Sequence, residues 1–341
     1  MLARWCLLGC LGIAPASAAT GFVGDSACAS CHPEQFGTQS ASQHAKALRP
    51  VRDSPLPAYL MDRPLREREG VAYEYTLVEQ GLRIQVRKHA SVASGLLEWT
   101  FGGGVQGLTP VGRADGKYFE HRVSYYPTRG KPAITIGHPL EPPRTARDGL
   151  GVRLDSRTIT KCFRCHATGV GETAGRGPQL DAMQPGIRCE RCHGPGSEHV
   201  RTAGAPAEQG AINIENPGRR SSRGVIEMCG ECHRLPEPGT MSARPEQDDP
   251  FNVRFQPMGL LASRCFSRSQ AVSCVTCHDP HEDARKDHAH YTAKCLSCHE
   301  TERDSVVECR RVERDNCLPC HMPKSSPSPF LYFTDHRIRV H

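Results

Sequence analysis

The sequence predicts a mainly α fold with extensive loops, plus a small β-rich module between the first two of its cysteine motifs. Hydrophobic residues make up 38% and aromatic residues 6% of the 341 residues, so side chains alone would form a thin apolar core. The chain also contains 32 glycines and 27 prolines, which favour many turns. Short helices and loops wrapped around a non-protein core fit this composition.

The cysteines indicate what that core is. Fourteen of the 18 fall in seven Cys-x-x-Cys-His motifs, which we number I to VII along the chain. The motifs are Cys28–Cys31–His32, Cys162–Cys165–His166, Cys189–Cys192–His193, Cys229–Cys232–His233, Cys274–Cys277–His278, Cys295–Cys298–His299 and Cys317–Cys320–His321.

Cysteines at i and i+3 lie on one face of a helical turn, so both sulfurs can bond to the vinyl groups of one haem. The histidine that follows can then bind the haem iron. Zinc ribbons lack the fixed histidine, and a thioredoxin-like site would occur only once. The sequence therefore predicts seven covalently bound c-type haems, around which the fold is organised.

The first residues have the pattern of an export signal. Arg4 is followed by an apolar stretch and by the small-residue site Ala16-Ser17-Ala18, so we expect a signal peptide at 1–18 and a periplasmic or otherwise exported protein. A lipoprotein signal ending at Cys10 is the less favoured alternative, because the apolar run before it is short. No later run approaches the ~20 apolar residues of a membrane span.

The spacing of the motifs divides the mature chain into three parts. We predict an N-terminal haem segment at 19–60, a β-rich module at 61–140 and a six-haem core at 141–341. Within the module, Val71 to Lys88 alternates apolar and polar residues around Gln80-Gly81, which predicts a hairpin. Leu96 to Phe101 and Tyr118 to Tyr126 are further predicted strands.

The formal net charge of +6 is not evidence for nucleic-acid binding. Removal of the signal peptide, together with the propionates of seven ferric haems, would bring the balance to about −2. Many arginines are therefore expected to pair with propionates. The expected partners are redox proteins rather than nucleic acids or a membrane.

Segments around the motifs resemble multihaem cytochromes. They are Val23 to His44, the stretch Cys189 to His199 that contains His193-Gly194-Pro195-Gly196, Cys277-His278-Asp279-Pro280-His281, and His321-Met322-Pro323-Lys324 with Thr334-Asp335-His336. The group with these features is the cytochrome c-554-like set, related to hydroxylamine oxidoreductase and pentahaem nitrite reductase. Two features depart from the related enzymes: no Cys-x-x-Cys-Lys motif occurs, and no long helical segment follows His321.

The resemblance and the positions of the remaining histidines predict the sixth iron ligands. They favour His44, His199, His281, His336, His138 and one of His288 and His290, for which we take His290. His281 is too close to His278 to reach the opposite face of the same haem, because three extended residues span only ~10 Å. If His281 binds iron, it must therefore serve a different haem. Met258 is a weaker candidate ligand, with packing as its favoured role.

Two functions are compatible with this sequence. The favoured one is electron transfer between redox partners through mainly bis-histidine haems. The alternative is an oxidoreductase that acts on nitrite, hydroxylamine, tetrathionate or a similar small compound at a five-coordinate haem. Outside the motifs, Cys265 and Cys309 are expected to form a disulfide in an oxidising compartment, with a free thiol as the alternative.

Overall fold

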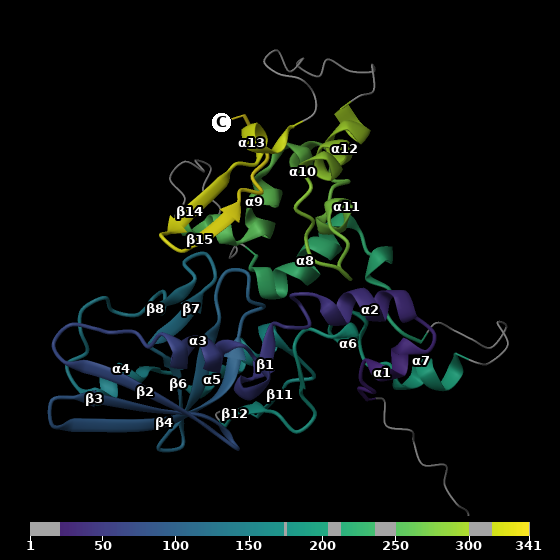
Figure 1. The fold of residues 1–341 in the computed structure, drawn as a ribbon. Coiled ribbons are helices and arrows are strands. Elements are labelled where there is room, and N and C mark those ends of the chain that lie inside the picture. Colours follow the sequence, from purple (N-terminus) through teal and green to yellow (C-terminus); the bar gives the residue numbers. More distant parts are fainter. Residues whose placement is uncertain (1–20, 174–175, 204–212, 236–249, 300–315, 341) are drawn as a thin grey trace, which may run out of the picture.

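The computed structural model describes residues 21–173, 176–203, 213–235, 250–299 and 316–340. Figure 1 shows a β-rich part beside two groups of short helices. One group contains α1, α2, α6 and α7, and the other contains α8 to α13 with the C-terminal strands. The expected signal peptide lies outside the described residues.

The largest unit is a seven-stranded antiparallel sheet with the order β2-β3-β4-β5-β6-β9, in which β1 also pairs with β4. Its strands are β1 (Leu48–Pro50), β2 (Val71–Val78), β3 (Gly81–Lys88), β4 (Ser91–Phe101), β5 (Thr109–Ala114), β6 (Lys117–His121) and β9 (Gly151–Arg153). The hairpin predicted over Val71 to Lys88 is confirmed, with Val78 paired to Gly81 at its turn.

The prediction of a mainly α fold is wrong. Of the described residues, 37% are helical and 26% are in strands, and the antiparallel sheet is large rather than a small insert. Two of its strands, β1 and β9, come from outside 61–140 and have only three residues each. Three residues are too few to show a period of two, so their place in the sheet could not be predicted.

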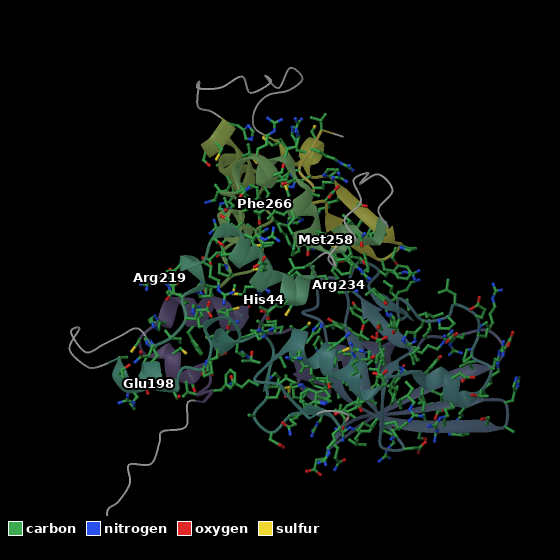
Figure 2. The ribbon with its side chains drawn as sticks, turned by 180° about the vertical axis from the view of Figure 1, so that it is seen from behind. His44, Glu198, Arg219, Arg234, Met258 and Phe266 are labelled. Carbon is green, nitrogen blue, oxygen red and sulfur yellow. The ribbon has the colours of Figure 1, made fainter. Side chains whose placement is uncertain are left out.

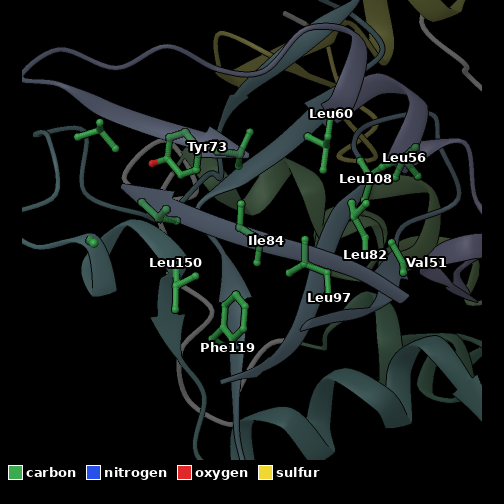
Figure 3. Packing of buried hydrophobic residues seen from close by; sticks show 14 residues of the cluster. Val51, Leu56, Leu60, Tyr73, Leu82, Ile84, Leu97, Leu108, Phe119 and Leu150 are labelled. Atoms are coloured by element: carbon green, nitrogen blue, oxygen red, sulfur yellow. The ribbon is translucent and has the colours of Figure 1, made fainter. Parts of the chain in front are cut away.

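The sheet packs its apolar face against two short helices, α3 (Leu56–Asp62) and α4 (Ala146–Leu150). Figure 3 shows the resulting cluster, in which Leu82, Ile84 and Leu97 of the sheet are fully buried. A two-stranded sheet, β7 (Val123–Tyr126) with β8 (Lys131–Ile134), adds Val123 to the cluster. Side chains alone therefore build the core of this part.

The haem motifs lie on short helices or at their ends. The helices are α1 (Ser26–Ala29), α2 (Pro33–Ala41), α5 (Ser156–His166), α6 (Cys189–His193), α7 (Ser197–Thr202), α8 (Ser222–His233), α9 (Gln256–Ala262), α10 (Arg264–Ser269), α11 (Cys274–Cys277), α12 (His288–His299) and α13 (Leu318–His321), with 3-10 turns η1 (Val51–Asp53), η2 (Pro217–Arg219) and η4 (Pro250–Arg254).

Three further two-stranded sheets join the loops between these helices. They are β10 (Ala167–Thr168) with β13 (Gln184–Pro185), β11 (Gly171–Thr173) with β12 (Gly177–Gln179), and β14 (Lys324–Ser328) with β15 (Leu331–Thr334). Within the described ranges, no helix is both long and apolar enough to cross a membrane.

Candidate haem-binding sites

Each motif has the local geometry that haem attachment requires. In motif II, both cysteines lie on α5, whose N-terminus is capped by the carboxylate of Asp155 accepting the Thr158 N–H at 2.6 Å. In motifs III and IV, the cysteines lie on α6 and α8. A helical turn places the cysteines at i and i+3 on one face, and the histidine that follows lies at the end of the turn.

Backbone carbonyls orient several of the motif histidines. Nδ1 of His166 lies 3.0 Å from the Ala47 carbonyl, Nδ1 of His193 lies 2.8 Å from that of Glu215, and Nδ1 of His321 lies 3.0 Å from that of Arg339. An Nδ1–H that donates to a carbonyl fixes the tautomer and leaves Nε2 free to bind a metal. This arrangement fits proximal haem ligands.

Four motif histidines each face a second imidazole ring. The ring centroids of His32 and His199 are 6.5 Å apart, those of His193 and His281 6.2 Å, those of His278 and His336 6.2 Å, and those of His44 and His233 6.1 Å. An iron bound by nitrogen on both sides would separate the centroids by about 6 Å, since such metal–nitrogen bonds are about 2 Å long. The donor set and spacing therefore fit haem iron.

In each pair, the second ring comes from a different part of the chain. His281, three residues after His278, faces His193 of motif III, whereas His278 faces His336 near the C-terminus. His44 follows motif I yet faces His233 of motif IV, and Figure 2 shows it where the two groups of helices meet. Gly186 helps to place His44, because a Cβ there would lie 2.1 Å from the Ala45 carbonyl oxygen.

Burial favours the neutral form of these imidazoles. Burial, together with the nearby His336, lowers the pKa of His278 to about 4. Burial also lowers the pKa values of His44, His233 and His336. The neutral imidazole is the form that binds a metal, so these rings are poised for ligation near neutral pH.

The other predicted ligands occupy different surroundings. His138 is buried and its Nε2 lies 3.0 Å from the Glu120 carboxylate. His290, at the start of α12, contacts the ring of Tyr291. His166 packs against Phe101 at a centroid distance of 5.1 Å, and no imidazole of the described residues faces it. Met258 lies on α9 (Figure 2).

A fully buried histidine within the predicted strand Tyr118 to Tyr126 joins three parts of the β-rich unit. Nδ1 of His121 lies 2.7 Å from the Leu150 carbonyl, and its Nε2 lies 2.8 Å from the Tyr75 hydroxyl. Burial lowers the pKa of His121 to about 4. His121 is therefore a neutral core residue of the sheet.

Cysteine side chains of different motifs lie close enough in four places to influence one another electrostatically. The pairs are Cys28 with Cys189, Cys165 with Cys232, Cys229 with Cys274, and Cys295 with Cys317. Helix α11 also contacts α12, and Arg191 of motif III reaches Glu231 of motif IV at 2.9 Å. The motifs thus follow one another in space in the order I, III, IV, V, VI, VII, with motif II beside motif IV.

Cys265 lies on α10, close enough to Cys298 of motif VI for the two side chains to influence one another electrostatically. Its predicted disulfide partner, Cys309, lies outside the described residues, so the disulfide stays a prediction. His341 lies outside them as well.

Part of the chain matches a known protein family, and its fold is similar to that of solved structures. Residues 142–194, which contain motifs II and III, match the family model of cytochrome c554 and c-prime. The outer cell wall cytochrome OcwA is similar in structure, with a TM-score of 0.54 and 15% identity over 93% of this chain and 79% of that one. The chain has the fold of a multihaem cytochrome.

An undecahaem cytochrome from the S-layer of Carboxydothermus ferrireducens is also similar, with a TM-score of 0.50 and 14% identity. The match covers 94% of this chain and 52% of that one, so this chain spans about half the length of that cytochrome. The comparison with curated protein sequences gives no match. The family that residues 142–194 match consists of c-type cytochromes, while a relation to hydroxylamine oxidoreductase is not shown.

Proposed function

We propose that this protein is an exported, periplasmic-type seven-haem c-type cytochrome that transfers electrons between redox partner proteins. The observation that carries the proposal is the set of four facing imidazole pairs, whose separations of 6.1 to 6.5 Å suit an iron between the rings. Two strong-field axial ligands favour reversible one-electron exchange over the binding of a substrate.

In this proposal, His32 and His199 bind the iron of motif I. His193 and His281 bind that of motif III. The remaining pairs, His233 with His44 and His278 with His336, serve motifs IV and V. His138 and His290 are the proposed sixth ligands among the other three irons, and the fourteen motif cysteines hold the haems.

The protein orients each ring and connects the sites. Haem supplies reversible exchange between ferric and ferrous iron. Carbonyl oxygens such as those of Ala47 and Glu215 fix the imidazole planes. Because cysteines of neighbouring motifs lie near one another, the haems that they would hold would also be neighbours. Because electron tunnelling decays steeply with edge distance, this order supports a conduit from motif I to motif VII, with motif II as a side branch at motif IV.

A second candidate function has one observation in its favour. Within the described residues, the ring of His166 faces Phe101 and no imidazole. A motif II iron with an open position would suit an oxidoreductase for a small nitrogen or sulfur compound, such as nitrite, hydroxylamine or tetrathionate.

The haem count and the ligand pairs can be tested together. Protein matured with a cytochrome c assembly system should have the mass of residues 19–341 plus seven haems. His281→Ala should keep all seven haems but turn one iron high-spin, and that iron should belong to motif III. His89→Ala, at an exposed position, is the matched control and should leave every spin state unchanged. Six haems, or a low-spin His281→Ala protein, would count against the proposal.

Carbon monoxide separates the two candidate functions. If every iron has two protein ligands, carbon monoxide added to the reduced protein should barely change the spectrum. Prompt binding by about one-seventh of the haem, with turnover of nitrite, hydroxylamine or tetrathionate, would favour the oxidoreductase instead.

A further inference from the structure

Glu190 is an unusual residue within a haem motif. It occupies one of the two variable positions of motif III, yet it is only 2% exposed. By contrast, the side chain of Glu231, at a variable position of motif IV, is 55% exposed. A buried carboxylate is costly unless donors surround it, so its partners indicate its role.

Both carboxylate oxygens of Glu190 accept hydrogen bonds from backbone N–H groups. Oε1 accepts from Val23 at 2.9 Å and from Gly196 at 2.8 Å. Oε2 accepts from Gly24 at 2.8 Å and from Val23 at 3.1 Å, and the Gln184 amide donates to it at 3.4 Å. One side chain therefore joins three separate segments of the chain.

Two of these segments carry the facing rings at motif I. Val23 and Gly24 directly precede α1, which leads to His32, and Gly196 is the N-cap residue of α7, which carries His199. Asp25 strengthens the junction, since its carboxylate accepts the Cys189 N–H at 3.2 Å. Glu190 thus lies at the point where motif I, motif III and the His199 helix meet.

We propose that Glu190 is a positioning residue that holds His199 opposite His32 and so sets the sixth ligand of the motif I iron. The inference rests on the proposed function in one respect, namely that an iron lies between these two rings. It adds that a residue of motif III governs the ligation of motif I, and thereby couples the first two haems of the proposed conduit.

Glutamine is the sharpest substitution, because it preserves the size of the side chain. The three backbone partners are all N–H donors, and glutamine has one acceptor oxygen where glutamate has two. Its NH₂ group would face a donor at either Gly24 or Gly196. Glu190→Gln should therefore loosen one of the joined segments without opening a cavity.

The test uses the mature seven-haem protein with four variants: Glu190→Gln, Glu190→Ala, His199→Ala and the double variant Glu190→Gln/His199→Ala. Glu231→Gln is the matched control. We expect His199→Ala to turn one iron high-spin, and Glu190→Gln to give part of the same high-spin signal with a shifted midpoint potential of that haem. Glu190→Ala should give more of the signal. The double variant should show no more high-spin iron than His199→Ala alone, since both act on one iron, and Glu231→Gln should match the wild type.

The possible failures are distinguishable. If His199→Ala leaves all irons low-spin, the proposed ligand pair is wrong. If His199→Ala produces high-spin iron while both Glu190 variants match the wild type, the ligand pair stands and the positioning role is wrong. The positioning role is also wrong if the double variant shows two high-spin irons. Should Glu190→Gln mature with fewer haems, peptide mapping must find the missing haem at Cys28 and Cys31, and loss at any other motif overturns the proposal.

Discussion

The β-rich part and the haem-bearing helices solve the problem of burial in different ways. The sheet, α3 and α4 bury a cluster of fourteen side chains that includes Leu82, Ile84 and Leu97. The described residues of α8 to α13 bury a cluster of only three, Ile226, Leu260 and Phe266. A chain with so small an apolar cluster needs another source of buried surface. In the haem-bearing part, the proposed porphyrins are that source. Folding of this part should therefore depend on haem attachment, whereas folding of the sheet should not.

The largest expected effect comes from deleting a haem at the centre of the helical part. Cys229→Ser/Cys232→Ser removes the attachment of motif IV, whose cysteines lie close to those of motifs II and V. Mass spectrometry should show six haems, and limited proteolysis should cut α8 to α13 rapidly while the sheet resists. Cys265→Ser is the control and should keep seven haems. If the helical part and the sheet of the double variant resist the protease equally, folding of the helical part does not depend on haem attachment at motif IV.

A cavity in the sheet should destabilise the β-rich part and leave the attachment of the haems unchanged. Leu97→Ala truncates a fully buried side chain, so the free energy of unfolding of the β-rich part should fall by about 2–5 kcal/mol. Denaturant titration followed by circular dichroism measures this, with Leu77→Ala as the control because Leu77 is 48% exposed. Haem content and spin states should be unchanged. Loss of haem from the Leu97→Ala protein would show that the two parts are not independent.

A further predicted effect is a pH dependence of the stability of the sheet. The folded-state pKa of His121 is lowered to about 4, below the usual value of 6.5, because the ring is buried. Between these values the unfolded chain binds a proton that the folded chain does not. The stabilisation is therefore complete above about pH 6.5 and declines as the pH falls towards 4, by about 3 kcal/mol in all.

His121→Gln should flatten this dependence in denaturant titrations at pH 4.5 and pH 7. The same change at the exposed His89 should leave it intact. An unaltered slope in the His121→Gln protein would mean that another group titrates.

The sequence by itself determined the attachment chemistry and the strong local patterns. Seven Cys-x-x-Cys-His motifs predict haem because the spacing acts within a single helical turn, and the Val71 to Lys88 hairpin follows from alternation over many residues. Even the reach argument at His281 needs only chain geometry, and its ring indeed faces His193 rather than His278.

The tertiary structure decided what depends on segments far apart in the chain. Strands β1 and β9 join the sheet through partners that three residues cannot specify, so the sequence did not predict the full extent of the sheet. The facing of His44 with His233, and of His336 with His278, joins residues too far apart in the chain for any local pattern to predict. Glu190 is the clearest case, because only the packing of three distant segments around it makes this motif side chain a buried acceptor. Local spacing determines which side chains can attach a haem, whereas long-range packing determines which imidazole rings face one another.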